Sequence, residues 1–195
     1  MGDRAAAGEA EVVRGIFDEA IALHGRVRDM DPGPVIAAAA AIRTAFAAGG
    51  KLLIFGNGGS AADAQHLATE LVVRFVRDRG ALPALALSTD TSVITAAAND
   101  YGFDRVFARQ IEALGRTGDA ALGISTSGES ANVLRAIETA NALGLRTIAL
   151  TGRDGGAIGR AAAITVNVPA AATARVQEVH STLIHVLCEL VERHL

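Results

Sequence analysis

Two loops rich in glycine and serine are the segments of this sequence best suited to chemistry. The first, residues 56–60 (GNGGS), follows a run typical of a buried strand and precedes a helical pattern. Glycines let the backbone approach a ligand closely, and the free N–H groups of a helix start favour an anion. The second, residues 125–130 (STSGES), places four hydroxyls around a glycine at another predicted helix start. Either loop alone could be an ordinary turn, but together they favour a phosphorylated ligand.

A pair of side chains that could bind a metal ion follows the first loop. His66 and Glu70 are four residues apart in a predicted helix, so both lie on one face, close enough to share a metal ion or a hydrogen bond. A solvated surface pair is the alternative. A second candidate pair, Gln177 and His185, lies in an apolar helical pattern near the C-terminus together with His180. Gln177 and His185 are about 12 Å apart along a straight helix. Either Gln177 therefore precedes the regular helix, or another subunit completes the site.

Two further motifs have competing interpretations. Asn99 and Asp100, followed by Tyr101 and Gly102, suit a turn, but an amide and a carboxylate also suit recognition of a polyol. Residues 56–61 (GNGGSA) also satisfy the dinucleotide fingerprint G-x-G-x-x-A, which expects an acidic residue about twenty positions on, at the end of the second strand. Neither Asp78 nor Asp90 meets that requirement, because one precedes the strand and the other lies too far along the chain. We therefore reject a dinucleotide site.

The elements that position these loops alternate along the chain. Short apolar runs, typical of parallel strands covered on both faces, are separated by longer helical patterns. The expected strands cover residues 51–56, 83–88, 119–125, 146–152 and 162–168, and the helical stretches between them include 60–75, 104–116 and 129–143. This alternation predicts a doubly wound α/β sandwich with a five-stranded parallel sheet. Amphipathic helices over 10–30 and 176–195 either cap this sheet or form an oligomer interface.

Composition narrows the class of protein. The chain has 195 residues, which suits one domain, and its net charge of −3 argues against a general nucleic-acid binder. The longest strictly apolar run, residues 35–42, is too short to cross a bilayer. The N-terminal segment lacks a signal-peptide pattern, and the single cysteine, Cys188, is compatible with a reducing compartment. These features predict a cytoplasmic protein without a membrane or nucleic-acid partner.

Several long motifs, in order along nearly the whole chain, resemble the bacterial phosphoheptose isomerases of the SIS (sugar isomerase) family. The matching stretches are GNGGSAADAQHLATELVVRF (56–75), LPALALSTDTSVITAAANDYGFDRVFARQIEALG (82–115), GISTSGESANVLRAI (123–137), ALTGRDGGAIG (149–159) and RVQEVHSTLIHVLCELVE (175–192). The resemblance implies an SIS-type fold and the isomerisation of D-sedoheptulose 7-phosphate to D-glycero-D-manno-heptose 7-phosphate, the first step toward nucleotide-activated heptose. It also implies a single domain over 1–195, in which 1–34 form an N-terminal oligomerisation helix and 35–195 the sandwich.

The same resemblance implies roles for individual residues. The divalent metal, usually zinc, would be bound by His66, Glu70, Gln177 and His185, of which Glu70 and His185 are also the implied base and acid. The implied substrate contacts, shared by the two loops and the later motifs, are Asn57, Gly58, Gly59, Ser60, Glu70, Arg74, Asn99, Asp100, Ser125, Thr126, Ser127, Ser130 and Gln177. Arg74 could instead be a solvated helix arginine. Some members have an aspartate where this chain has Ala174, so a carboxylate role there is in doubt.

The 12 Å separation of Gln177 and His185 leads us to expect a homotetramer, built partly by the flanking helices, with active sites at subunit interfaces. Two alternative functions compete with the isomerase. One is an SIS isomerase for another phosphosugar, against which Glu70, the Gln177/His185 pair and the ANDYG segment (98–102) argue. The other is a non-catalytic scaffold that binds the replication initiator, because close relatives of that kind lack parts of the catalytic set. This chain keeps both Glu70 and His185, which favours an enzyme.

Overall fold

A five-stranded, wholly parallel sheet forms the centre of the computed structural model, which describes residues 2–194 and side chains from residue 8 onward. The strands lie in the order β2-β1-β3-β4-β5. Their bounds are Leu52–Gly56 (β1), Ala84–Ala86 (β2), Ala120–Ser125 (β3), Arg146–Gly152 (β4) and Ile164–Val168 (β5). β1 and β3 are buried along their whole length, as their continuous apolar sequences require when helices cover both faces. The predicted sheet is confirmed.

The strand order reverses at β1, and this reversal brings the two predicted ligand loops together. From β1 the chain passes to β2 on one side, then returns to β3 on the other. Gly56 at the end of β1 is in register with Ile124 near the end of β3, so the loops that leave both strands start side by side. In open parallel sheets the crevice beyond the carboxyl ends of the strands at such a switch point is where ligands bind.

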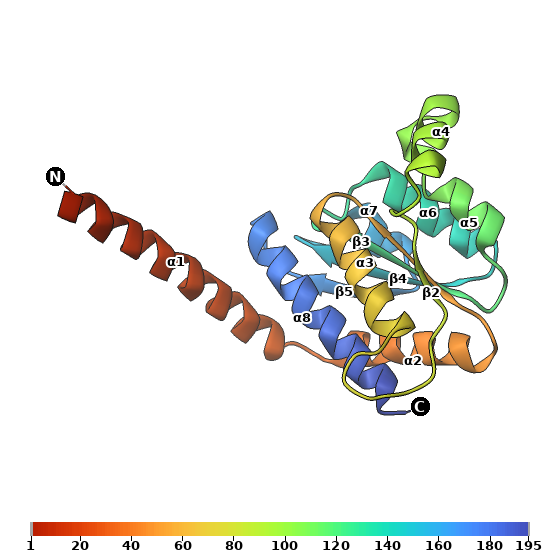
Figure 1. The fold of residues 1–195 in the computed structure, drawn as a ribbon, viewed down its shortest axis with the longest axis horizontal. Helices are drawn as coiled ribbons and strands as arrows, with labels where there is room; N and C mark the ends of the chain where they lie inside the picture. Colours follow the sequence, from red (N-terminus) through yellow and green to blue (C-terminus); the bar gives the residue numbers. More distant parts are fainter. Residues whose placement is uncertain (1, 195) are drawn as a thin grey trace.

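Helices cover both faces of the sheet (Figure 1). One face of the sheet packs against α2, α3 and α8, where Ile54 and Leu122 meet Leu67 and Ile184. The opposite face packs against α4–α7, where Phe55 meets Ile137. The helix bounds are Gly2–Arg28 (α1), Gly33–Ala47 (α2), Gly59–Val72 (α3), Thr91–Tyr101 (α4), Ala108–Leu114 (α5), Ala131–Ala142 (α6), Gly156–Ala161 (α7) and Thr173–Glu192 (α8), with a 3-10 turn at Phe103–Arg105 (η1).

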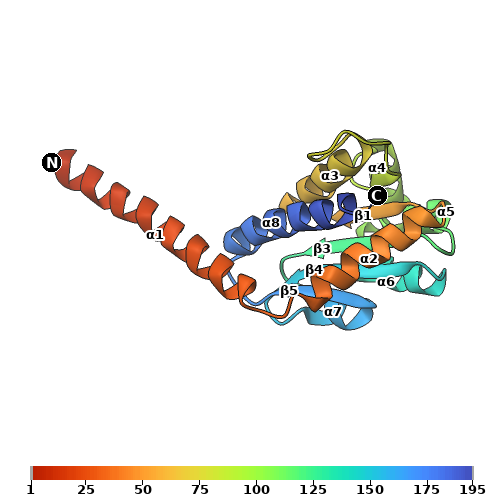
Figure 2. The same cartoon turned by 90° about the horizontal axis from the view of Figure 1, so that it is seen from below.

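α1 projects away from this body, as two views at right angles show (Figure 1, Figure 2). Its C-terminal end is fixed to α8, because His24 lies within hydrogen-bond distance of Thr182 (3.0 Å) and Arg175 donates to the carbonyl of Ile16 (3.1 Å). Apolar side chains on the other faces of α1, such as Val13 and Phe17, remain exposed. Of the two roles open to the terminal helices, α8 caps the sheet and α1 does not. No described helix combines the length and apolarity needed to span a membrane.

Some helices differ from the predicted spans for local reasons. Of the two interpretations of Asn99 and Asp100, a turn is excluded, because both residues lie in the last turn of α4. Asp90 caps the start of this helix by accepting the N–H of Val93 (3.0 Å), and Gly102 ends it with φ of 89°. The predicted helix 60–75 ends at Val72, and 104–116 divides into η1 and α5.

Candidate active site

Three side chains that could bind a metal ion meet where α3 packs beside α8. His66 and Glu70 project from α3 and His185 from α8, and one ligand atom from each lies within 4.8 Å of the other two. His66 Nε2 is 3.3 Å from Glu70 Oε1 and 3.2 Å from His185 Nε2. Two imidazole nitrogens at that distance repel through their lone pairs unless a proton or a cation lies between them. We refer to His66, Glu70 and His185 as the histidine–glutamate cluster.

The cluster is one of several contacts between α3 and α8, which run side by side in the same direction (Figure 1). Near the start of both helices, the amide of Gln177 lies so close to Gly59 that a Cβ on Gly59 would collide with it. One turn on, Ser181 donates to the buried carboxylate of Asp63 (3.1 Å). His185 then reaches His66 at the following level. This parallel alignment is what brings a residue near position 70 to one near position 185.

The sequence left open how Gln177 and His185 could serve one site. Gln177 lies inside α8, so the alternative that it precedes the regular helix is wrong. His185 reaches His66 and Glu70 within one chain, and no partner is needed to supply it. Gln177 lies at the level of Gly59, two turns before His185. Its participation in metal binding stays a prediction.

An amide pair ties the two ligand loops to each other. Asn57 donates to Asn132 Oδ1 and Asn132 donates to Asn57 Oδ1, both at 2.8 Å. Asn132 is buried in the first turn of α6, directly after residues 125–130 (STSGES), which we call the serine loop. This reciprocal pair fixes the plane of the Asn57 amide and leaves one donor and one acceptor site of Asn57 for a ligand. Asn132 could not be singled out from the sequence, because an asparagine in a first helical turn has many ordinary uses.

The serine loop gathers three hydroxyls at the start of α6. Ser125 Oγ lies 2.9 Å from Ser130 Oγ and 3.3 Å from Ser127 Oγ, while Thr126 is half-buried beside them in sequence. Ser130 occupies the N-cap position, but among the described side chains none caps the α6 N–H groups. These N–H groups and hydroxyls can donate to an anion, and the binding of a phosphate there stays a prediction.

The β4–α7 loop packs against the serine loop and is hydrogen-bonded to it. Gly128, with φ of 71°, packs so closely on Gly155 and Gly156 that a side chain at Gly128 would meet their backbone. Its carbonyl accepts the N–H of Ile158 (2.9 Å), and the carboxylate of Glu129 accepts the N–H of Ala157 (2.9 Å). The serine loop therefore caps the start of α7, which restricts its conformation.

The remaining predicted substrate residues lie in separate environments. Ser60 is buried in the first turn of α3, and Gly58 has φ of 56°, which favours glycine at that turn. Arg74 is exposed just beyond α3. Asn99 and Asp100 are exposed on α4, where the Asn99 amide donates to Asp100 (2.8 Å). Their roles stay predictions.

His180 is a core residue rather than part of the site. It is fully buried, and its Nε2 lies 3.0 Å from the carbonyl of Thr151, so this nitrogen must carry the hydrogen and donate it. Burial lowers the pKa of His180 to about 4, against the opposing effect of that backbone hydrogen bond. The imidazole is therefore neutral at pH 7.

Comparisons with known proteins agree with this geometry. The family model described as SIS domain matches residues 16–152. Phosphoheptose isomerase from Aquifex aeolicus is 52% identical over 182 residues, covering 93% of this chain and 95% of the relative, and that from Geotalea daltonii is 59% identical over 147 residues, covering 75% and 77%.

Solved structures extend the similarity to three dimensions. The phosphoheptose isomerase from Neisseria gonorrhoeae superposes with a TM-score of 0.89 at 45% identity, covering 94% of this chain and 98% of that one. The one from Francisella tularensis gives 0.91 at 37% identity, covering 95% and 98%. The identity to the Aquifex aeolicus relative and the similarity to the two solved structures extend over nearly the whole chain, and the family model matches residues 16–152. This chain belongs to the phosphoheptose isomerase family of SIS-domain proteins.

Proposed function

We propose that this protein isomerises D-sedoheptulose 7-phosphate to D-glycero-D-manno-heptose 7-phosphate. The observation that carries the proposal is the histidine–glutamate cluster between α8 and α3, the helix that starts at the sheet's switch point, in a chain of the phosphoheptose isomerase family. The serine loop beside that switch point supplies donors for a phosphate. An isomerase that acts on a phosphorylated ketose needs both features: a phosphate-binding site and acid–base groups at the reacting carbons.

The reaction moves a proton from C1 of the ketose to C2 through an enediol. Glu70 takes the proton from C1 and returns it at C2, and His185 transfers protons at the substrate oxygens, each typically contributing 10²–10⁴-fold. Glu70 Oε1 faces His66, which leaves the second carboxylate oxygen to act as the base. The serine loop binds the remote phosphate, and that binding energy orients the reacting end of the sugar.

The donor set of the cluster suits zinc. Two ligands of a tetrahedral zinc ion, each about 2.05 Å from the metal, are about 3.3 Å apart. The 3.2 Å between the two Nε2 atoms and the 3.3 Å between His66 and Glu70 match that separation. We assign His66, Glu70 and His185 as ligands, and Gln177, which lies two turns of α8 before His185, as a fourth ligand that another subunit would supply. When bound, zinc would supply a Lewis acid that stabilises the negative charge developing on the substrate.

Removing single hydroxyls from the serine loop tests the phosphate assignment. Ser125→Ala and Ser127→Ala should each lower kcat/KM by about 5- to 150-fold, since a hydrogen bond to a charged group contributes about 1–3 kcal/mol. Thr139→Ala, on α6 and bonded to the carbonyl of Arg135, is the control and should retain wild-type kinetics. Equal efficiency on sedoheptulose and its 7-phosphate would contradict a phosphate site.

The function itself is tested by comparing substrates. Purified protein with zinc should convert sedoheptulose 7-phosphate with a higher kcat/KM than five- and six-carbon ketose phosphates. A preference for one of those shorter sugars would indicate another SIS isomerase. Binding of phosphosugars without turnover of any would indicate a scaffold.

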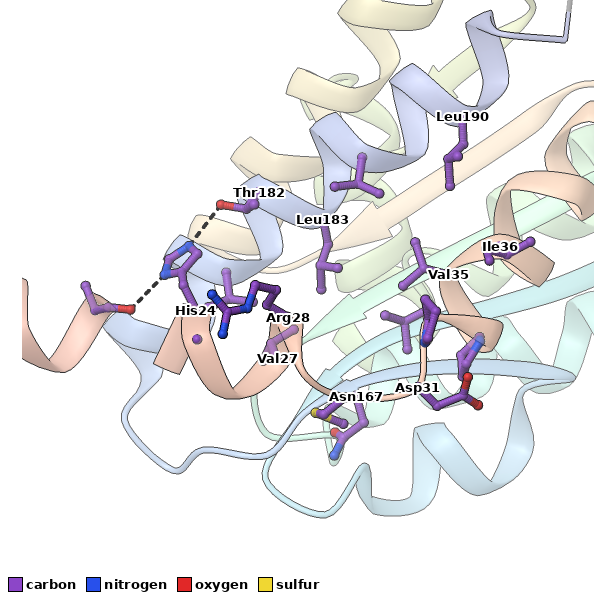
Figure 3. Close-up of a pocket in the computed structure, with 18 of the residues that line it drawn as sticks. His24, Val27, Arg28, Asp31, Val35, Ile36, Asn167, Thr182, Leu183 and Leu190 are labelled. Atoms are coloured by element: carbon purple, nitrogen blue, oxygen red, sulfur yellow. Dashed lines mark hydrogen bonds between the residues drawn. The ribbon is translucent and has the colours of Figure 1, made fainter. Parts of the chain in front are cut away.

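We further propose a homotetramer in which α1, within the oligomerisation segment 1–34, packs against a second copy of the chain. Phe17 and Ile21 are 64% and 67% exposed, and α1 reaches beyond the body of its own chain, which therefore cannot bury them (Figure 1). At the base of α1 a pocket of about 980 Å³ opens between α1, α2 and α8. Val35 and Leu183 line it (Figure 3). A tetramer would also give the exposed Asn99 and Asp100 a neighbouring active site to enter.

Charge placed on α1 should dissociate this assembly. Phe17→Glu combined with Ile21→Glu puts two carboxylates where apolar surface would be buried, so light scattering should report a smaller species than wild type. Leu143→Glu, an exposed apolar position at the end of α6, is the control and should leave the mass unchanged. A wild-type monomer at working concentration would contradict the tetramer.

A further inference from the structure

A second polar network, separate from the histidine–glutamate cluster, joins the C-terminal ends of α3 and α8. Its centre is Glu192, which is only 3% exposed and accepts three successive backbone N–H groups, those of Phe75 (3.0 Å), Val76 (3.2 Å) and Arg77 (3.1 Å). Desolvation tends to raise the pKa of Glu192, but these N–H groups and Arg79 hold it below its ordinary value. A carboxylate therefore fills an anion-binding turn of the segment that follows α3.

Arg79 connects this carboxylate to the last turn of α3. Its Nε donates to Glu192 Oε1 (3.1 Å), while its two terminal nitrogens donate to the carbonyls of Glu70 and Leu71, both at 2.7 Å. Carbonyls at a helix end lack partners within the helix, and Arg79 satisfies two of them. The backbone of Glu70, whose side chain belongs to the cluster, is thus bonded directly to this network.

The network also reaches His185 through Phe75. The Phe75 ring lies 5.4 Å from the His185 ring at 31°, and the Phe75 N–H is one of the groups that Glu192 holds. The hydrogen bond between Ser181 and Asp63 joins the two helices on the other side of the cluster. The helices are therefore fastened both before and after the point where they present His66, Glu70 and His185.

We propose that Glu192 and Arg79 are positioning residues that hold Glu70 and His185 at metal-binding distance. The inference rests on the proposed metal site, and it extends that site to two residues that touch neither metal nor substrate. Outer partners of metal ligands typically contribute 10–100-fold to metal affinity, because they fix the orientation of the ligands. The proposed phosphate site, the serine loop between β3 and α6, does not contact this network. Substrate binding should therefore be affected much less than metal binding.

The test is Glu192→Gln, which preserves shape but turns an NH₂ group toward backbone donors. Cobalt(II), titrated into apoprotein and followed by its visible absorption, reports metal affinity without any need for turnover. We expect the dissociation constant to rise by about 10–100-fold. In the zinc-loaded protein at saturating metal, kcat should fall by about tenfold or more while KM stays within about threefold. Displaced catalytic groups slow the chemical step more than they weaken substrate binding.

Asp119 provides a matched control. It is a carboxylate of equal burial that accepts the backbone N–H groups of Lys51 and Arg116 (2.9 Å each) and the Lys51 ammonium (2.6 Å), at the start of β3, and these partners lie outside α3 and α8. Asp119→Asn should lower the melting temperature comparably and leave cobalt affinity at the wild-type value. Equal loss of cobalt affinity in both variants, or none in Glu192→Gln, would overturn the proposal.

A second variant covers the case in which Glu192→Gln does not fold. Arg79→Lys keeps the charge near Glu192 but loses the fork that binds the Glu70 and Leu71 carbonyls, and it should weaken cobalt binding by about 10-fold. Unchanged cobalt affinity in Arg79→Lys would then overturn the proposal. Failure of the proposed function gives a different result: wild-type protein would bind cobalt, the variants would weaken it, and sedoheptulose 7-phosphate would not be turned over.

Discussion

Glu70→Gln is expected to lower kcat by a factor on the order of 10³ or more, since we propose that the side chain serves both as base and as metal ligand. Glutamine has nearly the same shape, so the packing of α3 on α8 should persist and phosphate binding should change little. Steady-state kinetics on sedoheptulose 7-phosphate measures the effect.

Glu138→Gln is the matched control for this substitution. Glu138 is an exposed carboxylate on α6, and its loss should leave kcat at the wild-type value. Activity of Glu70→Gln within tenfold of wild type would remove Glu70 from the mechanism.

Removal of the metal should have the next largest effect. Apoprotein prepared with a chelator is expected to lose activity by a factor on the order of 10² or more, because a Lewis acid contributes several kcal/mol of charge stabilisation. Zinc added back should restore the rate. Because the cluster lies between helices that pack through an apolar core, the circular dichroism spectrum should not change.

The same preparation separates a catalytic metal from a structural one. Apoprotein should still bind the sugar phosphate through the serine loop, as calorimetry would show. Full activity without metal would contradict the assignment of the cluster, and unfolding on chelation would indicate a structural role.

The centre of the sheet was predictable from sequence because β1 and β3 are buried along their whole length. Continuous apolar runs such as 120–125 mark such strands even without long-range information. α2 was harder to predict, because its alanine-rich sequence is apolar on all sides and shows little helical periodicity. At the end of α4, turn-forming residues outweighed the capping signals of Asp90 and Gly102, which define the helix.

The candidate site divides in the same way between local and long-range information. The spacing of His66 and Glu70 was enough to place them on one face of a helix. In the structure His66 Nε2 lies 3.3 Å from Glu70 Oε1. That His185 joins them depends on the parallel packing of α8 on α3, which no local pattern specifies. Asn132, Glu192 and Arg79 were missed for this reason: each acts through a partner distant in sequence.

The most direct test of the central claim follows the carbonyl group itself. Sedoheptulose 7-phosphate labelled with carbon-13 at C2 can be incubated with zinc-loaded protein and observed by NMR. We expect the C2 signal to move from the hemiketal region to that of a secondary alcohol carbon, as the carbonyl passes to C1, and Glu70→Gln to slow this change as it slows kcat. A label that stays in the hemiketal region with active-site metal present would contradict the account.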